Sequence, residues 1–145
     1  MADFSTGKIS IEAPLATVAA ALFDIAQYPT WSSAIKSVSV TSVDDKGRPV
    51  AATLSIDAGM MKDRVSLAYD WSKAPGRLSF SLTDADLLTA MDGAYVISAE
   101  DDDTTDVTYE LHVDLSMPIP SIMRKNAEKA TIEMALSQLK TFAEK

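Results

Sequence analysis

The chain has 145 residues, 47% of them hydrophobic, and its 13 Lys and Arg against 21 Asp and Glu give a formal net charge of −8. A field of this sign repels phosphate backbones and anionic headgroups, which disfavours binding to nucleic acid. The lack of cysteine excludes disulfides, thiolate nucleophiles and cysteine-ligated metals, and a single histidine leaves little material for a Ser–His pair or a His-rich metal site.

The length suits one domain spanning residues 1–145, because domains cluster near about 100–150 residues. The opening residues MADFSTGK lack the basic start and the apolar run of a secretory signal peptide. The longest apolar runs are far shorter than the roughly 20 residues that span a bilayer. We therefore expect a cytoplasmic protein without stable membrane insertion.

The first predicted elements are a strand and two short helices. Apolar and polar residues alternate over residues 8–13, which predicts a strand with one buried face. Pro14 suits the first turn of a helix, and apolar residues follow it at helical spacing. The Tyr28-Pro29 pair ends this helix, because a residue before proline avoids the α region. A second short helix is expected at residues 30–34.

From Ile35 to Leu115 the period of the pattern is two, which predicts about six antiparallel strands with one dry and one wet face. Turns are predicted at residues 44–47 and 74–76, where Asp, Gly and Pro gather. The pattern is less regular over residues 87–99. Gly93 suggests a β-bulge that shifts the register there, and we expect Tyr95 to point inward.

The last predicted element is a long helix. Residues 122–143 contain neither Pro nor Gly, and Ser121 is the expected N-cap. Apolar residues cover most of the circumference of this helix and leave one polar stripe. A helix that is apolar on more than one side has two things to pack against, which is unusual for a helix on a flat sheet.

Several short motifs, in this order and spacing, carry a resemblance to a known family. They are residues 9–14 followed by a helix, Tyr28-Pro29-Thr30-Trp31, Asp92-Gly93-Ala94-Tyr95, the run TDVTYEL at residues 105–111, and the ending MPIPSIMRKNAEKA. With them the chain resembles the START-like, helix-grip superfamily (SRPBCC), and within it the actinobacterial branch of the polyketide cyclase/dehydrase and lipid-transport family. The resemblance implies an α+β fold in which a curved sheet of about seven strands grips the last helix over an apolar cavity.

Alternation places a set of apolar side chains on the inner face of the sheet, with two phenols and an indole N–H as their only polar atoms. General acid–base catalysis needs a positioned group that titrates near the working pH. The residues of this inner face therefore predict a ligand-binding cavity with no catalytic residue, cofactor or metal. We expect an apolar small molecule, lipid-like or aromatic polyketide-like, to contact Trp31, Leu54, Ile56, Leu67, Tyr69, Trp71, Phe80, Tyr95, Tyr109 and Met134.

Two other functions stay open at this point. A polyketide cyclase or aromatase would need an ionisable group in the cavity, supplied by the loops or by Arg124 or Glu128 of the last helix. An interaction role follows from the resemblance alone, since some actinobacterial relatives are described as the toxin partner of a small antitoxin. Homodimerisation is likewise left open.

Other polar residues have simpler interpretations. His112 occupies an outward position of its strand, which predicts a solvated side chain, and Arg64 is likewise predicted to point outward. The run Glu100-Asp101-Asp102-Asp103 lacks the spaced ligands and glycine of a calcium-binding EF-hand loop, and predicts a solvated hairpin turn. Flexible methionines suit an adaptable apolar surface, and three lie near predicted strand ends where a cavity mouth would open: Met60, Met61 and Met117.

Overall fold

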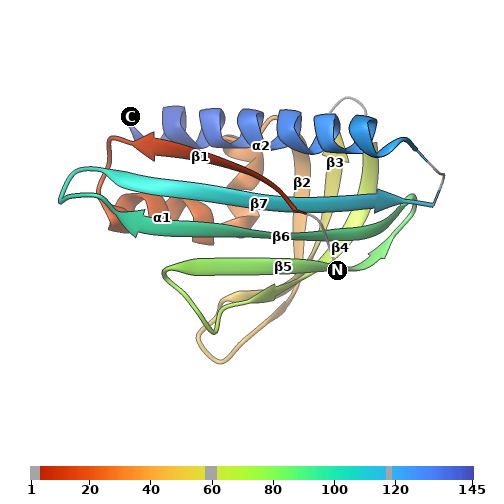
Figure 1. Cartoon of the computed structure of the whole chain (residues 1–145). Coiled ribbons are helices and arrows are strands. Elements are labelled where there is room, and N and C mark those ends of the chain that lie inside the picture. Colours follow the sequence, from red (N-terminus) through yellow and green to blue (C-terminus); the bar gives the residue numbers. More distant parts are fainter. Residues whose placement is uncertain (1–3, 58–61, 117–118) are drawn as a thin grey trace.

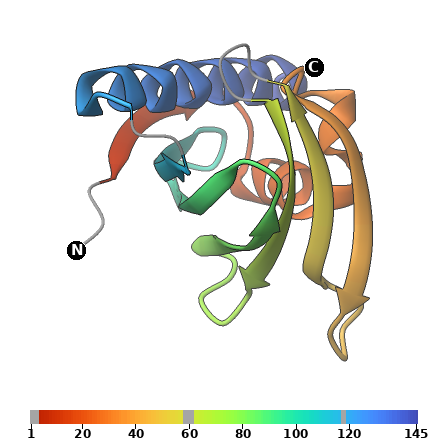
Figure 2. The same ribbon diagram turned by 90° about the vertical axis from the view of Figure 1, so that its right-hand side faces the viewer.

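The computed structural model describes residues 4–57, 62–116 and 119–145. A curved antiparallel sheet wraps around one long helix, and two short helical segments close one end (Figures 1 and 2). The elements in chain order are β1 (Ser5–Ile11), α1 (Leu15–Phe23), the 3-10 helix η1 (Ile25–Thr30), β2 (Ile35–Val43), β3 (Pro49–Asp57), β4 (Lys62–Asp70), β5 (Arg77–Ala85), β6 (Leu88–Ala99), β7 (Thr105–Leu115) and α2 (Ser121–Ala143).

The seven strands form one sheet in the order β1-β7-β6-β5-β4-β3-β2. Strands β2 to β7 follow one another as antiparallel neighbours, and β1 pairs with β7 although nearly the whole chain separates them. Figure 2 shows the sheet curving beneath α2, with its concave face toward the helix. The predicted α+β helix-grip fold is confirmed.

The alternation along the strands corresponds to burial as predicted. In β7, Val107, Tyr109, Leu111 and Val113 are at most 5% exposed, and the residues between them are more exposed. Such strict alternation is typical of a sheet with one face packed on a core. The inner face of the sheet therefore supplies most of the buried residues, and the space beneath α2 lies on that face.

The bulge predicted at Gly93 is wrong, although the inward position of Tyr95 is confirmed. The pairing of β6 with β7 is continuous through Gly93, which lies opposite Leu111, and the irregularity lies between Leu88 and Ala90. Gly93 is instead a point of close approach. A Cβ atom built there would lie 2.5 Å from Cζ of Phe80, so only glycine lets that ring cross the strand.

The helical segment after β1 differs from the prediction. Helix α1 already ends at Phe23, because Asp24 adopts a non-helical ψ of 74°. The following η1 contains Pro29 in its last turn, so the proline lies inside a 3-10 helix and does not end the α-helix. The second helix predicted at residues 30–34 is wrong, since residues 31–34 connect η1 to β2 without helical structure.

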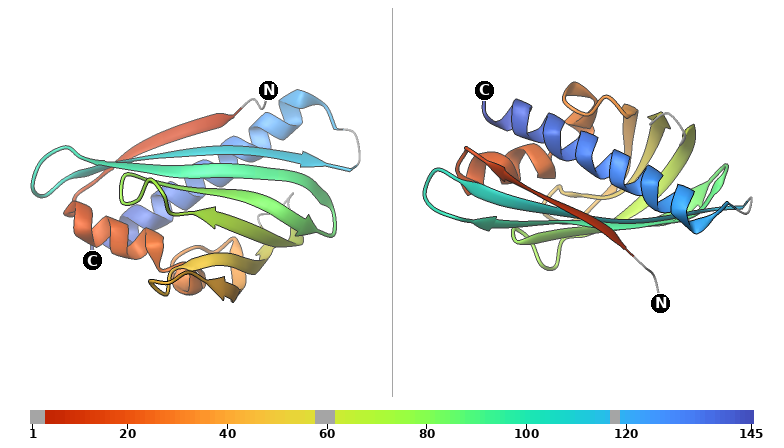
Figure 3. Two further views of the ribbon diagram at one scale, coloured as in Figure 1. Left: turned by 90° about the horizontal axis from the view of Figure 1, so that it is seen from below. Right: turned by 45° about the horizontal axis from the view of Figure 1, so that its top comes forward.

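Helix α2 confirms the predicted two-sided burial but not the predicted cap. Ser121 is the first helical residue, and Pro120 precedes it without a side-chain cap. One flank of α2 packs on β1 and β7, where Gly7 of β1 lies so close that an added Cβ would be 2.5 Å from Cγ2 of Ile132. Figure 3 shows this helix crossing the sheet beside β1. Within the described residues, no helix is both long enough and apolar enough to cross a bilayer.

Candidate functional site

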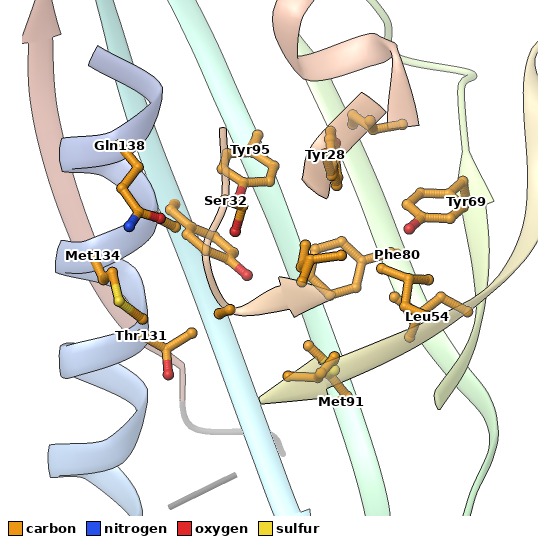
Figure 4. Close-up of a pocket in the computed structure, with 17 residues that line it drawn as sticks. Tyr28, Ser32, Leu54, Tyr69, Phe80, Met91, Tyr95, Thr131, Met134 and Gln138 are labelled. Carbon is orange, nitrogen blue, oxygen red and sulfur yellow. The ribbon is translucent and has the colours of Figure 1, made fainter. Parts of the chain in front are cut away.

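A cavity of about 60 Å³ lies between α2, the inner face of the sheet and the segment that follows η1 (Figure 4). We call it the central cavity. Most of its wall is carbon: aliphatic and aromatic side chains from β3 to β7 form the floor, and α2 forms the roof. The lining residues are Tyr28, Ser32, Ala34, Ile35, Leu54, Ile56, Leu67, Tyr69, Leu78, Phe80, Met91, Tyr95, Tyr109, Thr131, Met134, Ala135 and Gln138.

All four tyrosines of the chain line this cavity. The rings of Tyr95 and Tyr109 stack with centroids 4.2 Å apart, and Phe80 lies between Tyr109 and Tyr69 at 6.4 and 6.2 Å. Burial raises the pKa of each tyrosine hydroxyl above its ordinary value. The phenols therefore stay protonated at neutral pH and act as hydrogen-bond donors, not as bases.

Some polar groups of the lining are already engaged within the protein. The hydroxyl of Tyr28 donates to the carbonyl of Leu22 at 2.5 Å, and the hydroxyl of Thr131 donates to that of Ala127 at 2.9 Å. Among the described residues, no carboxylate, lysine, arginine or histidine lines the cavity. A molecule inside it would meet aromatic and aliphatic surface with a few neutral hydrogen-bonding groups.

Eight of the ten residues predicted to contact a ligand line the central cavity. They are Leu54, Ile56, Leu67, Tyr69, Phe80, Tyr95, Tyr109 and Met134. Figure 4 shows Met134 on the cavity side of α2, with Tyr69 and Phe80 facing it from the sheet. These eight side chains line the same cavity, and their contact with a ligand stays a prediction.

Trp71 is buried, as alternation predicts, but it does not line the central cavity. It lies one residue beyond the end of β4 at Asp70. The indole N–H of Trp71 donates to the carbonyl of Pro49, and the ring meets Phe23 edge-on at 5.2 Å. The guanidinium of Arg48 lies 5.3 Å from the ring centroid, and both side chains line a surface groove between α1 and the strands β2 and β3.

Trp31 lies next to the cavity but does not line it. Its ring packs edge-on against Tyr28 at 5.2 Å and stacks on Phe142 of α2 at 6.5 Å. The Nε1 atom is buried and has no hydrogen-bond partner in the structure. An unpaired buried donor costs roughly 1–3 kcal/mol, so the segment after η1 carries an unfavourable contribution in this position.

The lining residues that sequence reasoning missed come from α2, from the segment after η1, and from η1, β2, β5 and β6, which supply Tyr28, Ile35, Leu78 and Met91. Thr131, Ala135 and Gln138 share the cavity flank of α2 with Met134, and their spacing of three and four residues is a signal that could have identified them. Ser32 and Ala34 lie on the irregular segment after η1, where no periodic pattern applies, so no such signal was available for them.

Glu128 and Arg124 are buried outside the cavity. The fully buried carboxylate of Glu128 accepts hydrogen bonds from the Ser5 hydroxyl and the Val113 backbone N–H, each at 2.7 Å, and from Arg124 at 3.1 Å. Val113 lies on the part of β7 that extends beyond β1, so Glu128 occupies the place of a missing strand neighbour. This arrangement connects α2 to the sheet and supplies no ionised group to the cavity.

His112 is not the solvated residue that its parity predicts. Its side chain is only 16% exposed, because Phe4 and the Arg124 side chain of α2 lie against it. Its Nδ1 atom lies 3.2 Å from the guanidinium of Arg124. The outward direction was correct, but an outward residue near a sheet edge is buried when a helix lies over that edge.

The remaining predictions concern the surface. Arg64 points outward as predicted and pairs with Asp84 and Asp86. The acidic run at residues 100–103 forms the exposed turn between β6 and β7, as expected. Among the described residues, no group of three acidic or histidine side chains is arranged to hold a metal. The predictions for Met60, Met61 and Met117 lie outside the described residues.

Solved structures with the same fold come from several bacteria. A START superfamily protein from Mycobacterium smegmatis is 21% identical over 97% of each chain, with a TM-score of 0.92. The protein TTHA0849 from Thermus thermophilus is 20% identical over 97% of each chain, with a TM-score of 0.79. The ZhuI aromatase/cyclase from Streptomyces sp. R1128 is 13% identical over 99% of this chain and 94% of its own, with a TM-score of 0.81.

At these identities the likeness shows the fold alone, and a search of curated proteins found no match. The family itself is shown by a sequence profile. The profile described as polyketide cyclase/dehydrase and lipid transport matches residues 3–144, which is nearly the whole chain. The protein therefore belongs to the polyketide cyclase/dehydrase and lipid-transport family.

Proposed function

We propose that the protein binds a neutral small molecule with an aromatic or otherwise flat apolar ring in the central cavity. The observation that carries this proposal is the lining, in which all four tyrosines and Phe80 gather around one space beneath α2. Aromatic side chains favour stacked and edge-on contacts with other rings. Apolar pockets with a few polar groups are the usual form of small-molecule sites.

The chemistry of the lining favours an uncharged ligand. A carboxylate brought into this cavity would lose its hydration and meet no cation among the described lining residues, at a cost of several kcal/mol. A hydroxyl or carbonyl oxygen, in contrast, can pair with a protonated tyrosine or with the amide of Gln138. We therefore infer a ring that carries neutral oxygen substituents, and not a free fatty acid.

The size of the cavity limits what enters without rearrangement. Its volume of about 60 Å³ is well below the roughly 300–1,000 Å³ of typical ligand sites. Met91 and Met134 line it, and methionine side chains change rotamer easily. We expect the cavity to widen as the ligand enters. This widening lowers the affinity, which we place at roughly micromolar or weaker.

A cyclase or aromatase activity is the second candidate, and the lining does not favour it. Such a reaction needs an acid or a base beside the substrate. The candidates Arg124 and Glu128 are engaged with each other on the flank of α2 that faces β1 and β7. The phenols have raised pKa values and so are poor bases at neutral pH. Binding without reaction is the function that this geometry supports best.

The first experiment asks whether the purified protein carries a ligand. The protein is extracted with organic solvent and the extract is analysed by mass spectrometry, in parallel with titration by N-phenylnaphthylamine, a neutral aromatic fluorophore. We expect a neutral aromatic compound in the extract or a saturable rise in fluorescence. An empty extract together with no fluorescence response would contradict the proposal.

The second experiment fills the cavity by substitution. Ala135 lines the cavity and Ala130 is exposed on the same helix, so Ala135→Leu and Ala130→Leu add the same side chain to the same element. Ala135→Leu removes space that the ligand needs, and we expect the affinity for the fluorophore to fall about tenfold or more, a factor equivalent to about 1.4 kcal/mol. Ala130→Leu should leave it unchanged. Equal affinities for both variants would show that the probe binds elsewhere.

A further inference from the structure

Helix α2 is attached to the molecule along one flank. Ile132, Leu136 and Leu139 are buried where α2 packs on β1 and β7. Near the two ends of this flank, the carboxylates of Glu128 and Glu144 accept hydrogen bonds from the backbone of β7 and of residue 12. This side of the helix is therefore packed and hydrogen-bonded along its length.

The opposite flank of α2 faces the central cavity; among the described residues, Gln138 joins it to Ser33 by hydrogen bonds and Phe142 stacks on Trp31. The backbone N–H of Ser33 donates to Oε1 of Gln138 at 3.0 Å, and Nε2 of Gln138 donates to the Ser33 hydroxyl at 2.8 Å. The same hydroxyl lies 3.7 Å from the sulfur of Met134. We call this contact the Ser33–Gln138 bridge. Figure 4 shows Gln138, Met134 and Thr131 along the cavity side of α2, next to Ser32.

The segment that carries Ser33, residues 31–34, is tethered by its backbone at both ends and closed as a turn by the Ile35 N–H, which donates to the Ser32 carbonyl at 3.2 Å. At one end the backbone N–H of Ser32 donates to Tyr28 at 2.8 Å, and at the other Ala34 accepts from Asp57 at 2.7 Å. Ser33 between them is exposed, whereas its neighbours Ser32 and Ala34 are buried and line the cavity. Displacement of Ser33 from α2 therefore leaves both backbone tethers intact.

From this arrangement we propose that the Ser33–Gln138 bridge is the entrance of the central cavity, and that ligand passes when the bridge opens. The inference rests on the proposed function and adds the route to it. Three lining residues lie at this point: Ser32, Met134 and Gln138. Opening here also breaks the contact between Ser33 and the sulfur of Met134, which frees that side chain to change rotamer, so that one movement both admits the ligand and enlarges the space.

The bridge is suited to opening because water can replace it. Ser33 is exposed and Gln138 is half-buried, so both hydrogen bonds exchange for hydrogen bonds to solvent when they break. The flank that packs on β1 and β7 has no such exchange available for its buried leucines and isoleucine. Opening at the bridge is therefore the movement of α2 that exposes least apolar surface.

The test locks the bridge by chemical cross-linking. The natural chain has no cysteine, so Ser33→Cys with Gln138→Cys introduces the only two thiols, which a short bismaleimide can join. Binding of N-phenylnaphthylamine is followed by stopped-flow fluorescence before and after cross-linking. We expect the association and dissociation rates both to fall by about tenfold or more, because a locked entrance slows passage in both directions.

The matched control joins α2 to the sheet on the packed flank. Glu12→Cys with Glu144→Cys uses two exposed residues whose backbone N–H and carboxylate are 2.8 Å apart in the natural protein. Cross-linking this pair should leave both rates within about twofold. If the bridge cross-link also leaves the rates unchanged while the fluorophore still binds, the entrance lies elsewhere and the inference is overturned. If the unmodified natural protein does not bind the fluorophore and its solvent extract is empty, the proposed function itself is overturned.

A second variant tests the same entrance without cross-linking. Ser33→Ala with Gln138→Ala removes the side-chain partners of the bridge and leaves the backbone of residues 31–34 tethered at Tyr28 and Asp57. We expect association of the fluorophore to become faster by a few-fold or more, because the double variant removes both exposed hydrogen bonds of the bridge. An unchanged association rate would contradict control by the bridge.

Discussion

Gly93 positions the aromatic floor of the cavity because it lacks a side chain. Phe80 lies opposite it across the β5–β6 pair, and the ring passes over the backbone of Gly93. A Cβ atom at this position would lie 2.5 Å from Cζ of Phe80 and 2.8 Å from the carbonyl oxygen of Glu110. The Phe80 side chain has some freedom to move, whereas the Glu110 carbonyl belongs to the β7 backbone and has little.

Gly93→Ala should therefore destabilise the fold and disturb the cavity together. We expect a loss of about 1–3 kcal/mol in the free energy of unfolding, the usual cost of overpacking a core, measured by urea denaturation. Gly76→Ala is the control, since the nearest atom to an added Cβ there is 3.8 Å away. Equal stability of the two variants would show that the β6 backbone adjusts without cost.

Individual residues show where alternation along a strand predicts direction and where it fails. Tyr69 and Tyr109 lie within paired strands, and the period of two placed both correctly. Trp71 lies one residue beyond β4, where the chain leaves the sheet and the indole turns to Pro49. His112 keeps its outward direction but is covered by another element. A pattern gives the face of a strand, and it does not report strand ends or what lies over that face.

At the level of elements, Glu128 makes the attachment of α2 to the sheet depend on charge. Its carboxylate accepts three hydrogen bonds, including the one from the β7 backbone, and it is fully buried. Removing one partner of a buried ion pair leaves the other charge uncompensated. Here the remaining charge would be Arg124, whose side chain is 14% exposed.

Glu128→Ala should cost about 3–5 kcal/mol in the free energy of unfolding, the range for breaking a buried pair. Glu133→Ala removes the same side chain from an exposed position of the same helix, and it should change stability by no more than about 0.5 kcal/mol. Both are measured by urea denaturation at neutral pH. A loss for Glu128→Ala no larger than that of the control would mean that Arg124 finds solvent or another partner.

The elements themselves differ in how far the sequence predicts them. Helix α2 was predicted to its last turn, with apolar residues on two sides, because Ile122 to Ala143 has no helix breaker. The change from α1 to the 3-10 helix η1 at Asp24 was not predicted, because an α-helix and a 3-10 helix place apolar residues at similar spacing. Ser32 and Ala34 of the site were missed for another reason, since no period applies to the irregular backbone of residues 31–34.

For the whole molecule, the pattern together with the family resemblance predicted the fold and a cavity, but not the size of the cavity. Seven strands with one apolar face and a helix with two apolar flanks require a sheet that curves around the helix. The volume left between them is a small difference between the space enclosed and the side chains that fill it. One methylene group changes that difference appreciably in a close-packed interior, so the value of about 60 Å³ required coordinates.

The gathering of all four tyrosines in one cavity predicts how the stability of the molecule depends on pH. Burial raises the pKa of each hydroxyl in the folded protein, while in the unfolded chain the pKa returns to about 10. The associated stability is therefore fully present below about pH 10 and is lost as the pH rises further, at up to about 1.4 kcal/mol per tyrosine and pH unit.

Urea denaturation at about pH 8 and about pH 11, with tyrosinate absorbance as a second signal, should show a sharp loss of stability in which ionisation coincides with unfolding. Tyr69→Phe should reduce this loss by one tyrosine's share. Gradual ionisation of the folded protein, with an unchanged free energy of unfolding, would mean that water already reaches these phenols and that the cavity is not the dry site we propose.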